Sequence, residues 1–152
     1  MSQSNTRVGD IRVLANLSLL GMEGRLVKMV DGMGFPALNP IDDPADLALY
    51  LVIEGASNGQ LASVRPIDPG RNIRVALLGA CAPGDILVLA VPGQTGANAG
   101  KVMTFTGLAT PGTYRAVAIA EEAGVDGQLV LCRPAMLGLL EVKAPAGGGG
   151  GN

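Results

Sequence analysis

The side chains of this chain most able to do chemistry are its clustered carboxylates, and the densest cluster surrounds Pro44. Asp42, Asp43 and Asp46 lie within one short segment there. Carboxylate oxygens are the ligands that calcium prefers, but the segment lacks the glycine and the distal glutamate of an EF-hand loop. Aspartates beside a proline are equally typical of a turn that is held by aspartate side-chain hydrogen bonds. We favour the turn over a calcium site.

A second pair of carboxylates, Glu121 and Glu122, lies in a predicted connection between strands. In an extended segment neighbouring side chains point to opposite faces, so the two would not share one proton. The chain has no histidine, and acid–base catalysis would therefore need an Asp, Glu, Lys or Tyr with a strongly shifted pKa. No pair of residues is framed for that role, and we expect no catalytic residue and no enzyme activity.

The two cysteines, Cys81 and Cys132, are far apart in the sequence and form no Cys-x-x-Cys motif. Without histidine they offer neither a zinc site nor a thiol–imidazole nucleophile. A disulfide between them is one alternative, and two buried free thiols are the one we expect. We therefore predict no metal and no cofactor.

The basic residues are scattered along the chain rather than clustered as nucleic-acid binding requires. Five arginines fall at predicted strand edges or turns, where they would either form a rim facing acidic partners or remain solvated; they are Arg65, Arg71, Arg74, Arg115 and Arg133. The net charge is −2. The chain has no Trp and only two Phe and two Tyr, so it offers little aromatic surface on which bases could stack. Nucleic-acid binding is therefore not expected.

The composition predicts an all-β fold. The 152 residues include 23 glycines and 10 prolines and are 48% apolar, which indicates many short strands and turns around a real core. No apolar run approaches the length of a membrane span, and we expect no membrane partner. We predict a compact single-domain β-barrel or sandwich of short antiparallel strands.

One predicted hairpin would organise this fold. It joins strands at Tyr114–Ala120 and Gln128–Cys132 through a turn that contains Asp126-Gly127. A similar pattern occurs earlier, at Asn72–Leu78 and Asp85–Val91, with matching residues at a constant offset. Two copies are too few to establish a repeat from sequence. The expected core residues are Ile53, Val75, Leu87, Leu89, Val117, Ile119, Leu129 and Leu131.

The remaining segments complete the domain plan. Residues 1–20 are expected to form an extended N-terminal arm, residues 21–142 the β-domain, and residues 143–152 a disordered glycine-rich tail. Residues 35–46, which contain three prolines, should be a surface loop. Further strands are expected at 24–30, 47–54, 61–67 and 101–106, and a short strand or helical turn at 136–142.

The order of these elements between Gly24 and Pro134 resembles the head-decoration, or capsid cement, proteins of tailed bacteriophages. The stretches that carry the resemblance are Gly24-Arg25-Leu26-Val27, Leu49–Val52, Val64-Arg65-Pro66 to Arg74-Val75, Ala82-Pro83-Gly84-Asp85, Gly112-Thr113-Tyr114-Arg115, Ala118-Ile119-Ala120-Glu121-Glu122 and Gly127-Gln128-Leu129-Val130. These are turn and core patterns rather than a catalytic signature.

The resemblance implies a structural virion protein that binds the major capsid protein on the outer surface of an expanded shell and stabilises it, as a homotrimer around threefold positions. Before assembly it would reside in the host cytoplasm. Residues 2–20 would then lie on the shell and add a strand to a sheet edge of the capsid. An alternative comes from Lys101-Val102-Met103, which resembles the modified hairpin of biotinyl and lipoyl carrier domains. In that reading Lys101 would carry the cofactor.

Overall fold

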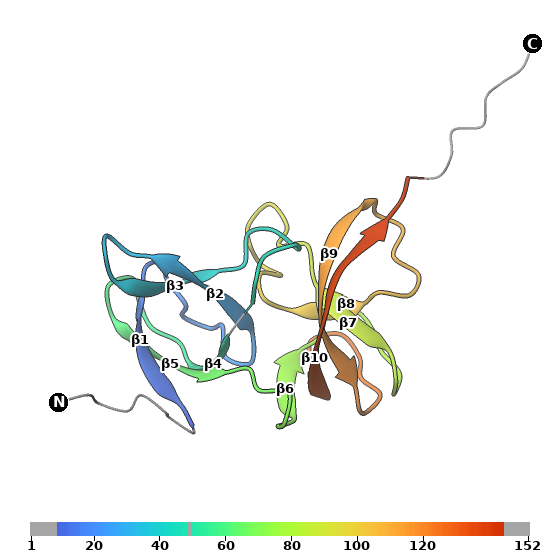
Figure 1. Ribbon diagram of the computed structural model, residues 1–152, viewed down its shortest axis with the longest axis horizontal. Helices are drawn as coiled ribbons and strands as arrows, with labels where there is room; N and C mark the ends of the chain where they lie inside the picture. Colours follow the sequence, from blue (N-terminus) through green and yellow to red (C-terminus); the bar gives the residue numbers. More distant parts are fainter. Residues whose placement is uncertain (1–8, 49, 145–152) are drawn as a thin grey trace, which may run out of the picture.

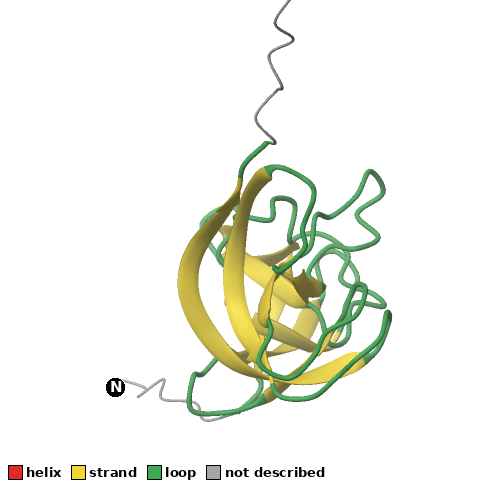
Figure 2. Cartoon of the chain, turned by 90° about the vertical axis from the view of Figure 1, so that its right-hand side faces the viewer, coloured by secondary structure: helices red, strands yellow, loops and turns green. Residues whose placement is uncertain are grey.

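A computed structural model describes residues 9–48 and 50–144. These residues form ten β-strands and no helix, so the predicted all-β class is confirmed (Figures 1 and 2). The strands are β1 (Ile11–Ala15), β2 (Leu26–Asp31), β3 (Pro36–Pro40), β4 (Tyr50–Glu54), β5 (Leu61–Pro66), β6 (Ile73–Ala76), β7 (Ile86–Leu89), β8 (Val102–Thr104), β9 (Gly112–Ala120) and β10 (Leu129–Val142).

The first five strands close into a barrel with the order β1-β3-β2-β4-β5. β2 and β3 form an antiparallel hairpin, while β1 lies parallel to β3 and antiparallel to β5, which closes the ring. Closure leaves none of these strands with a free edge along the ring, and small residues such as Ala15 and Ala62 are fully buried inside it.

The barrel corrects the predicted N-terminal arm. Ile11–Ala15 is a barrel strand, and the segment behind it is bound as well, since Leu19 N donates to Ala56 O at 2.8 Å and the Leu19 side chain is fully buried. Apolar residues at every second position, Ile11, Val13 and Ala15, were the signal in the sequence that could have predicted this strand. Residues 1–8, the rest of the expected arm, lie outside the described residues, as do Leu49 and residues 145–152 of the expected tail.

The predicted loop at residues 35–46 is also corrected, because it contains β3. Its prolines stand at the two ends of the strand, where Pro36 is opposite Asp31 and Pro40 opposite Val27. At these ends a missing N–H group does not interrupt the ladder. The central Ala37 and Leu38 are fully buried. The strand itself lies between β1 and β2 in the barrel.

The other five strands form a second sheet with the order β6-β10-β9-β7-β8. The sheet curls until its two edges approach, because Leu77, just after β6, bridges to Val102 on β8, and Leu78 N donates to Val102 O at 2.8 Å. β10 is 14 residues long and merges the predicted strands 128–132 and 136–142, with an irregularity between Pro134 and Gly138.

The two predicted hairpins exchange strands. β6 pairs with the first part of β10, with Val75 opposite Val130, and β7 pairs with β9, with Leu87 opposite Ala118. Neither predicted pair of strands therefore forms the expected tight hairpin, and of Gln128–Cys132 only Cys132 faces β9. In the two similar segments β6 corresponds to β9, and β7 corresponds to the first part of β10. The pair of β6 with β10 therefore corresponds to the pair of β9 with β7. A duplicated strand–turn–strand unit whose copies interlock accounts for both observations.

One apolar cluster joins the barrel to the second sheet. It contains Leu26, Ile41 and Leu51 from the barrel side and sixteen buried residues in all, including the predicted core residues Val75, Leu87, Leu89 and Val117. The prediction was wrong at the start of β10, where Val130 and Cys132 point inward. Leu129 is 48% exposed, and Leu131, Ile119 and Ile53 are half-buried. A register slip of one residue exchanges the faces of a strand.

Candidate functional site

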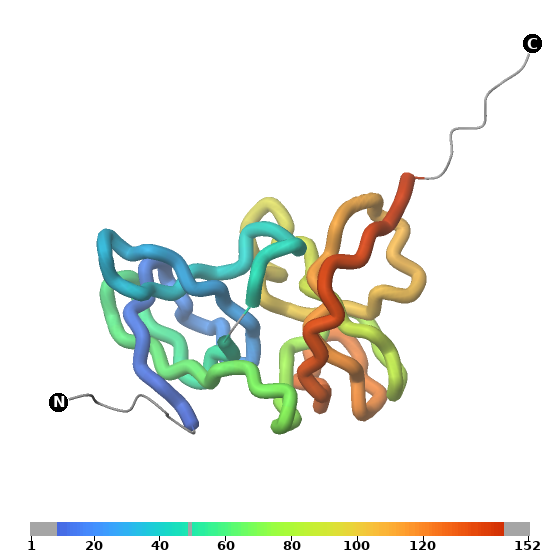
Figure 3. Tube along the Cα trace, viewed as in Figure 1, coloured from blue at the N-terminus to red at the C-terminus, as the bar shows by residue number. Residues whose placement is uncertain are grey.

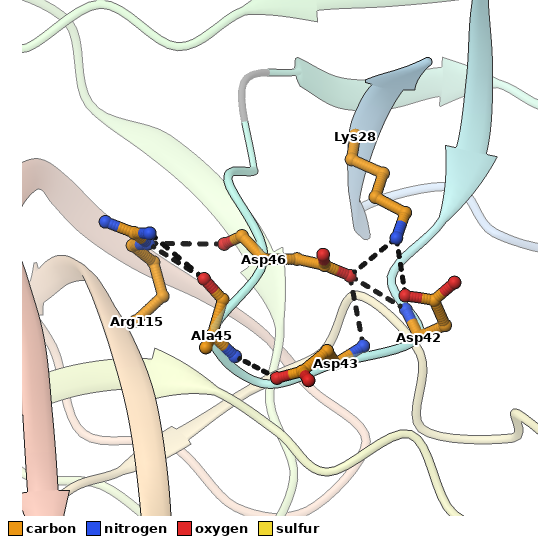
Figure 4. Close-up of polar contacts among 6 residues, drawn as sticks. All are labelled: Lys28, Asp42, Asp43, Ala45, Asp46 and Arg115. Carbon is orange, nitrogen blue, oxygen red and sulfur yellow. Dashed lines mark hydrogen bonds and ion pairs between the residues drawn. The ribbon is translucent and has the colours of Figure 1, made fainter. Parts of the chain in front are cut away.

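The acidic loop, residues 42–46, folds around one carboxylate (Figure 4). Oδ2 of Asp46 accepts hydrogen bonds from Lys28 Nζ at 2.9 Å, from Asp43 N at 3.0 Å and from Asp42 N at 3.1 Å. Lys28 also forms an ion pair with the Asp42 carboxylate. The ammonium group of β2 thus lies between two of the aspartates that the sequence marked as a possible cation site.

This arrangement fits the turn interpretation and explains why the loop does not resemble a calcium site. Asp43 Oδ1 accepts from Ala45 N at 2.7 Å, which is an aspartate turn. The positive charge that balances the loop is supplied by Lys28, a residue that sequence spacing could not connect to it. Within residues 9–48 and 50–144, no group of three or more carboxylate or thiol residues is arranged to hold a metal ion.

The acidic loop also connects the barrel to the second sheet. Arg115 on β9 donates from its backbone N to Pro44 O at 2.7 Å, and its guanidinium reaches Ala45 O at 3.0 Å and Asp46 O at 3.3 Å (Figure 4). Lys28 holds the same loop from the barrel side. The loop is therefore a joint that is held by one cation from each sheet.

Hydrogen bonding sets the charge of this joint. Burial alone would raise the pKa of Asp46, but the hydrogen bonds from Lys28 and the backbone N–H groups outweigh it and hold that pKa below its ordinary value. For Lys28, burial opposes the charged form, yet the bonds to Asp42 and Asp46 raise its pKa. Both groups are charged at neutral pH.

Replacing Asp46 by Asn should make stability less dependent on pH. A carboxyl whose pKa is lower in the folded state stabilises the protein above its unfolded pKa, and that contribution is lost as pH falls through the folded value. We expect the free energy of unfolding of the wild type to fall below about pH 4. Asp46→Asn should be about 1 kcal/mol less stable at neutral pH, and its free energy of unfolding should fall less steeply in acid. Urea denaturation at several pH values measures both. An equal loss of stability in acid for the two proteins would contradict the stabilising role of the Asp46 carboxylate.

Glu121 and Glu122 serve structural contacts rather than one shared proton site. Glu122 Oε1 accepts from Arg74 Nη1 at 2.7 Å and from Leu131 N at 2.9 Å, and these bonds, the backbone one first, lower its pKa. Glu121 forms an ion pair with Arg133 at 3.3 Å. The pair fixes the connection between β9 and β10.

The cysteines are both free and both buried, as expected from the sequence. Burial, more than the neighbouring charges, raises the pKa of Cys132 to about 12 and also raises that of Cys81. Neither thiol is therefore activated as a nucleophile.

Lys101 does not occupy the position that a carrier domain requires. β7 and β8 form a hairpin in which Leu89 faces Val102, so Lys101 stands at the base of the connection and not at its tip. Its backbone O accepts from Ala90 N at 3.0 Å, and its half-buried side chain donates to Asn98 Oδ1 at 3.2 Å. A modifying enzyme would need a lysine on an exposed turn.

The predicted arginine rim is largely occupied by contacts within the chain. Arg65 pairs with Asp10 at 2.7 Å, and Arg74, Arg115 and Arg133 form the contacts described above. Arg71 lies in the exposed turn before β6. These cations thus hold the two sheets and their connections in place.

Two surface features were missed by the sequence analysis. The first is the β2–β3 turn, residues 31–35, called the tip below, where Met33 is 97% and Phe35 69% exposed. The second is a groove of about 480 Å³ between the barrel and the second sheet, lined mainly by apolar residues of β4, β6 and β10. A Met and a Phe within a glycine turn were the available signal for the tip. The groove depends on how distant strands pack.

A larger hollow of about 610 Å³ lies between residues 18–22, the end of β3 and the connection 92–99. Arg25 crosses it, donating from Nη1 to Ala97 O at 2.8 Å. The described part of the chain contains no helix long and apolar enough to cross a membrane.

Comparison with known proteins defines the class of fold. No protein-family model and no curated protein matches the sequence. Among solved structures, the chain has the same two-sheet all-β fold as "head fiber gp8.5 N base in bacteriophage phi29". The TM-score is 0.61 and the identity 18%, and the match covers 84% of this chain and 93% of that chain. This likeness establishes the fold.

Proposed function

We propose that this protein is a structural component of a bacteriophage virion that binds the outer surface of the capsid. The observation that carries the proposal is the likeness to the phi29 head fiber base over nearly the whole of both chains.

The finer proposal is that the protein cements the expanded shell. A domain that binds one shell conformation better than another stabilises it by mass action, whatever chemistry the contact uses. The shared core and the acidic loop connect the barrel to the second sheet, and such a connected domain suits a clamp across neighbouring capsid subunits. Its partner is then the major capsid protein, and copies of the chain associate as a trimer at threefold positions.

Binding to shells assembled without this chain tests the proposal. We expect purified protein to sediment with such shells, to saturate at a fixed ratio to the capsid protein, and to raise the temperature at which the shells release DNA. The same protein mixed with shells that already carry it is the control and should remain in the supernatant.

The outcome also separates cementing from attachment of a fibre. Saturation near one copy for each capsid subunit together with a higher release temperature supports cementing. Saturation at a few sites with an unchanged release temperature supports a fibre base and contradicts cementing. A chain that never sediments with shells contradicts both.

A further inference from the structure

The tip presents two large apolar side chains that contribute nothing to the core of their own chain. Met33 is 97% exposed and has a φ of 60°, and it is the one non-glycine residue with a positive φ among those described. That conformation is costly for a side chain with a Cβ atom. A strained and almost fully exposed apolar residue points to a function outside the chain's own fold.

The tip is held in a fixed conformation by its own hydrogen bonds. Asp31 Oδ1 accepts from Gly34 N at 2.6 Å, and Phe35 O accepts from Gly32 N at 2.8 Å. The turn extends a ladder that runs from Val27 opposite Pro40 to Asp31 opposite Pro36. An apolar anchor that is already ordered loses little conformational entropy on binding, which favours its use in an interface.

The groove offers a surface of matching chemistry. It lies where β4 approaches β6 and the first part of β10, and Leu51, Ile53, Leu129 and Leu131 line it. Leu129 remains 48% exposed and lies against Gly24, where any Cβ atom would overlap its Cδ2. The volume of about 480 Å³ falls within the range of sites that bind compact apolar groups.

The tip and the groove carry complementary hydrogen-bonding groups. Asp31 brings a carboxylate to the tip, and it forms no salt bridge within the described residues. The groove is lined by Arg65 and Arg74, which already have the carboxylate partners Asp10 and Glu122, and by one further carboxylate, Glu23, so it carries no net positive charge. Arg65 uses Nε and Nη2 for Asp10, and Arg74 uses Nη1 for its partners, so each retains further N–H donors.

A chain cannot place its own tip in its own groove. The β2–β3 turn lies at the outer end of the barrel, whereas β6 and the first part of β10 lie at the junction with the second sheet (Figures 1 and 3). Both features therefore remain open on a single copy. A second copy supplies the missing half of each.

We propose that the tip of one copy inserts into the groove of the next, with Met33 and Phe35 against Leu129 and Leu131, and with Asp31 facing Arg65 and Arg74. The two surfaces differ, so the contact is head-to-tail, and such contacts build a closed ring when their rotation closes. Closure after three copies gives the trimer. The inference rests on the association of copies proposed above and does not depend on binding to a shell.

Sedimentation-velocity measurements on two matched variants test this contact. The tip variant carries Met33→Ser and Phe35→Ser, and the groove variant carries Leu129→Glu. Each keeps one half of the contact intact. We expect each alone to be monomeric, with self-association weakened about tenfold or more. Mixed together they should form a one-to-one pair, because the intact tip of one fits the intact groove of the other.

Exposed apolar residues elsewhere give the controls. The control variants are Leu139→Glu and Val125→Ser. Leu139 lies on the same strand as Leu129 and is 51% exposed, and Val125 lies in another turn and is 58% exposed. Both controls should associate like the wild type. Thermal melting of every variant shows whether it remains folded.

The results separate this contact from association in general. A wild type that associates while the tip variant associates equally well overturns the tip–groove contact and leaves the trimer standing. Variants that are monomeric alone but fail to pair when mixed also overturn it. A wild type that remains monomeric at all accessible concentrations overturns both the contact and the trimer.

Discussion

Leu26→Ala should lower the free energy of unfolding by about 2–5 kcal/mol, the range for deleting a fully buried leucine side chain. Leu26 on β2 has no exposed surface and belongs to the apolar cluster that joins the barrel to the second sheet. Its backbone N also donates to Gly100 O at 2.8 Å, across the two halves. The loss should therefore be felt by both sheets at once.

The two tyrosines make this measurable, because the chain has no tryptophan and one tyrosine stands in each sheet, Tyr50 on β4 and Tyr114 on β9. Urea denaturation followed by fluorescence in Tyr50→Phe and Tyr114→Phe backgrounds reports each sheet separately. We expect coincident transitions that shift together. Leu139→Ala, at a half-exposed position outside the groove, is the control and should cost less than about 1 kcal/mol. A shift confined to the Tyr50 signal would mean that the sheets unfold independently.

Gly100→Ala should be among the most damaging single changes in the chain, at about 3 kcal/mol or more. Gly100 has a φ of +72°, and a Cβ atom there would overlap the Leu26 carbonyl oxygen and lie 3.0 Å from Leu26 N. The substitution therefore adds backbone strain and also forces the 92–100 connection away from β2, which breaks the bond between the two halves.

Gly96→Ala separates these two effects. Gly96 lies in the same connection with a φ of +70°, but nothing lies within 4 Å of the added Cβ atom. It should cost only the conformational strain, about 1–2 kcal/mol. Urea denaturation of both variants measures the difference. Equal losses would show that close packing of this connection against β2 does not contribute to stability.

Met33→Gly should act in the opposite direction. Glycine adopts the φ of 60° without penalty, and the methionine side chain is 97% exposed, so little packing is lost. We expect a gain of about 1 kcal/mol in the free energy of unfolding. Met29→Gly, within β2, is the control and should destabilise. Both changes are made in the Leu129→Glu background, in which the proposed contact between copies is blocked, and a loss of stability in Met33→Gly there would show that the tip conformation is not strained.

The fold class and most strands follow from local signals in the sequence. Alternating apolar residues predict strands at β2, β5, β7 and β9, and glycine turns separate them. Which strands pair was not predictable, because β6 pairs with a strand more than fifty residues later and local pattern carries no such information. The strand β3 was missed because prolines at its ends resemble loop signals, although the intervening Ala37 and Leu38 are buried.

The site was predictable to the same degree. The aspartate turn at Asp43 follows from neighbouring residues and was foreseen. Lys28, Arg115 and the groove between the sheets depend on the packing of distant strands, and no spacing rule connects them. The inward residues of β10 were shifted by one position because leucine and valine alternate without a polar face to fix the register.

The most direct test of the central claim is quantitative mass spectrometry of purified virus particles from the source that encodes this chain. The account predicts that the chain is present in the particles at a copy number comparable to that of the major capsid protein. A copy number limited to a few per particle would contradict cementing and keep the virion assignment. Particles that lack the chain altogether would contradict the account.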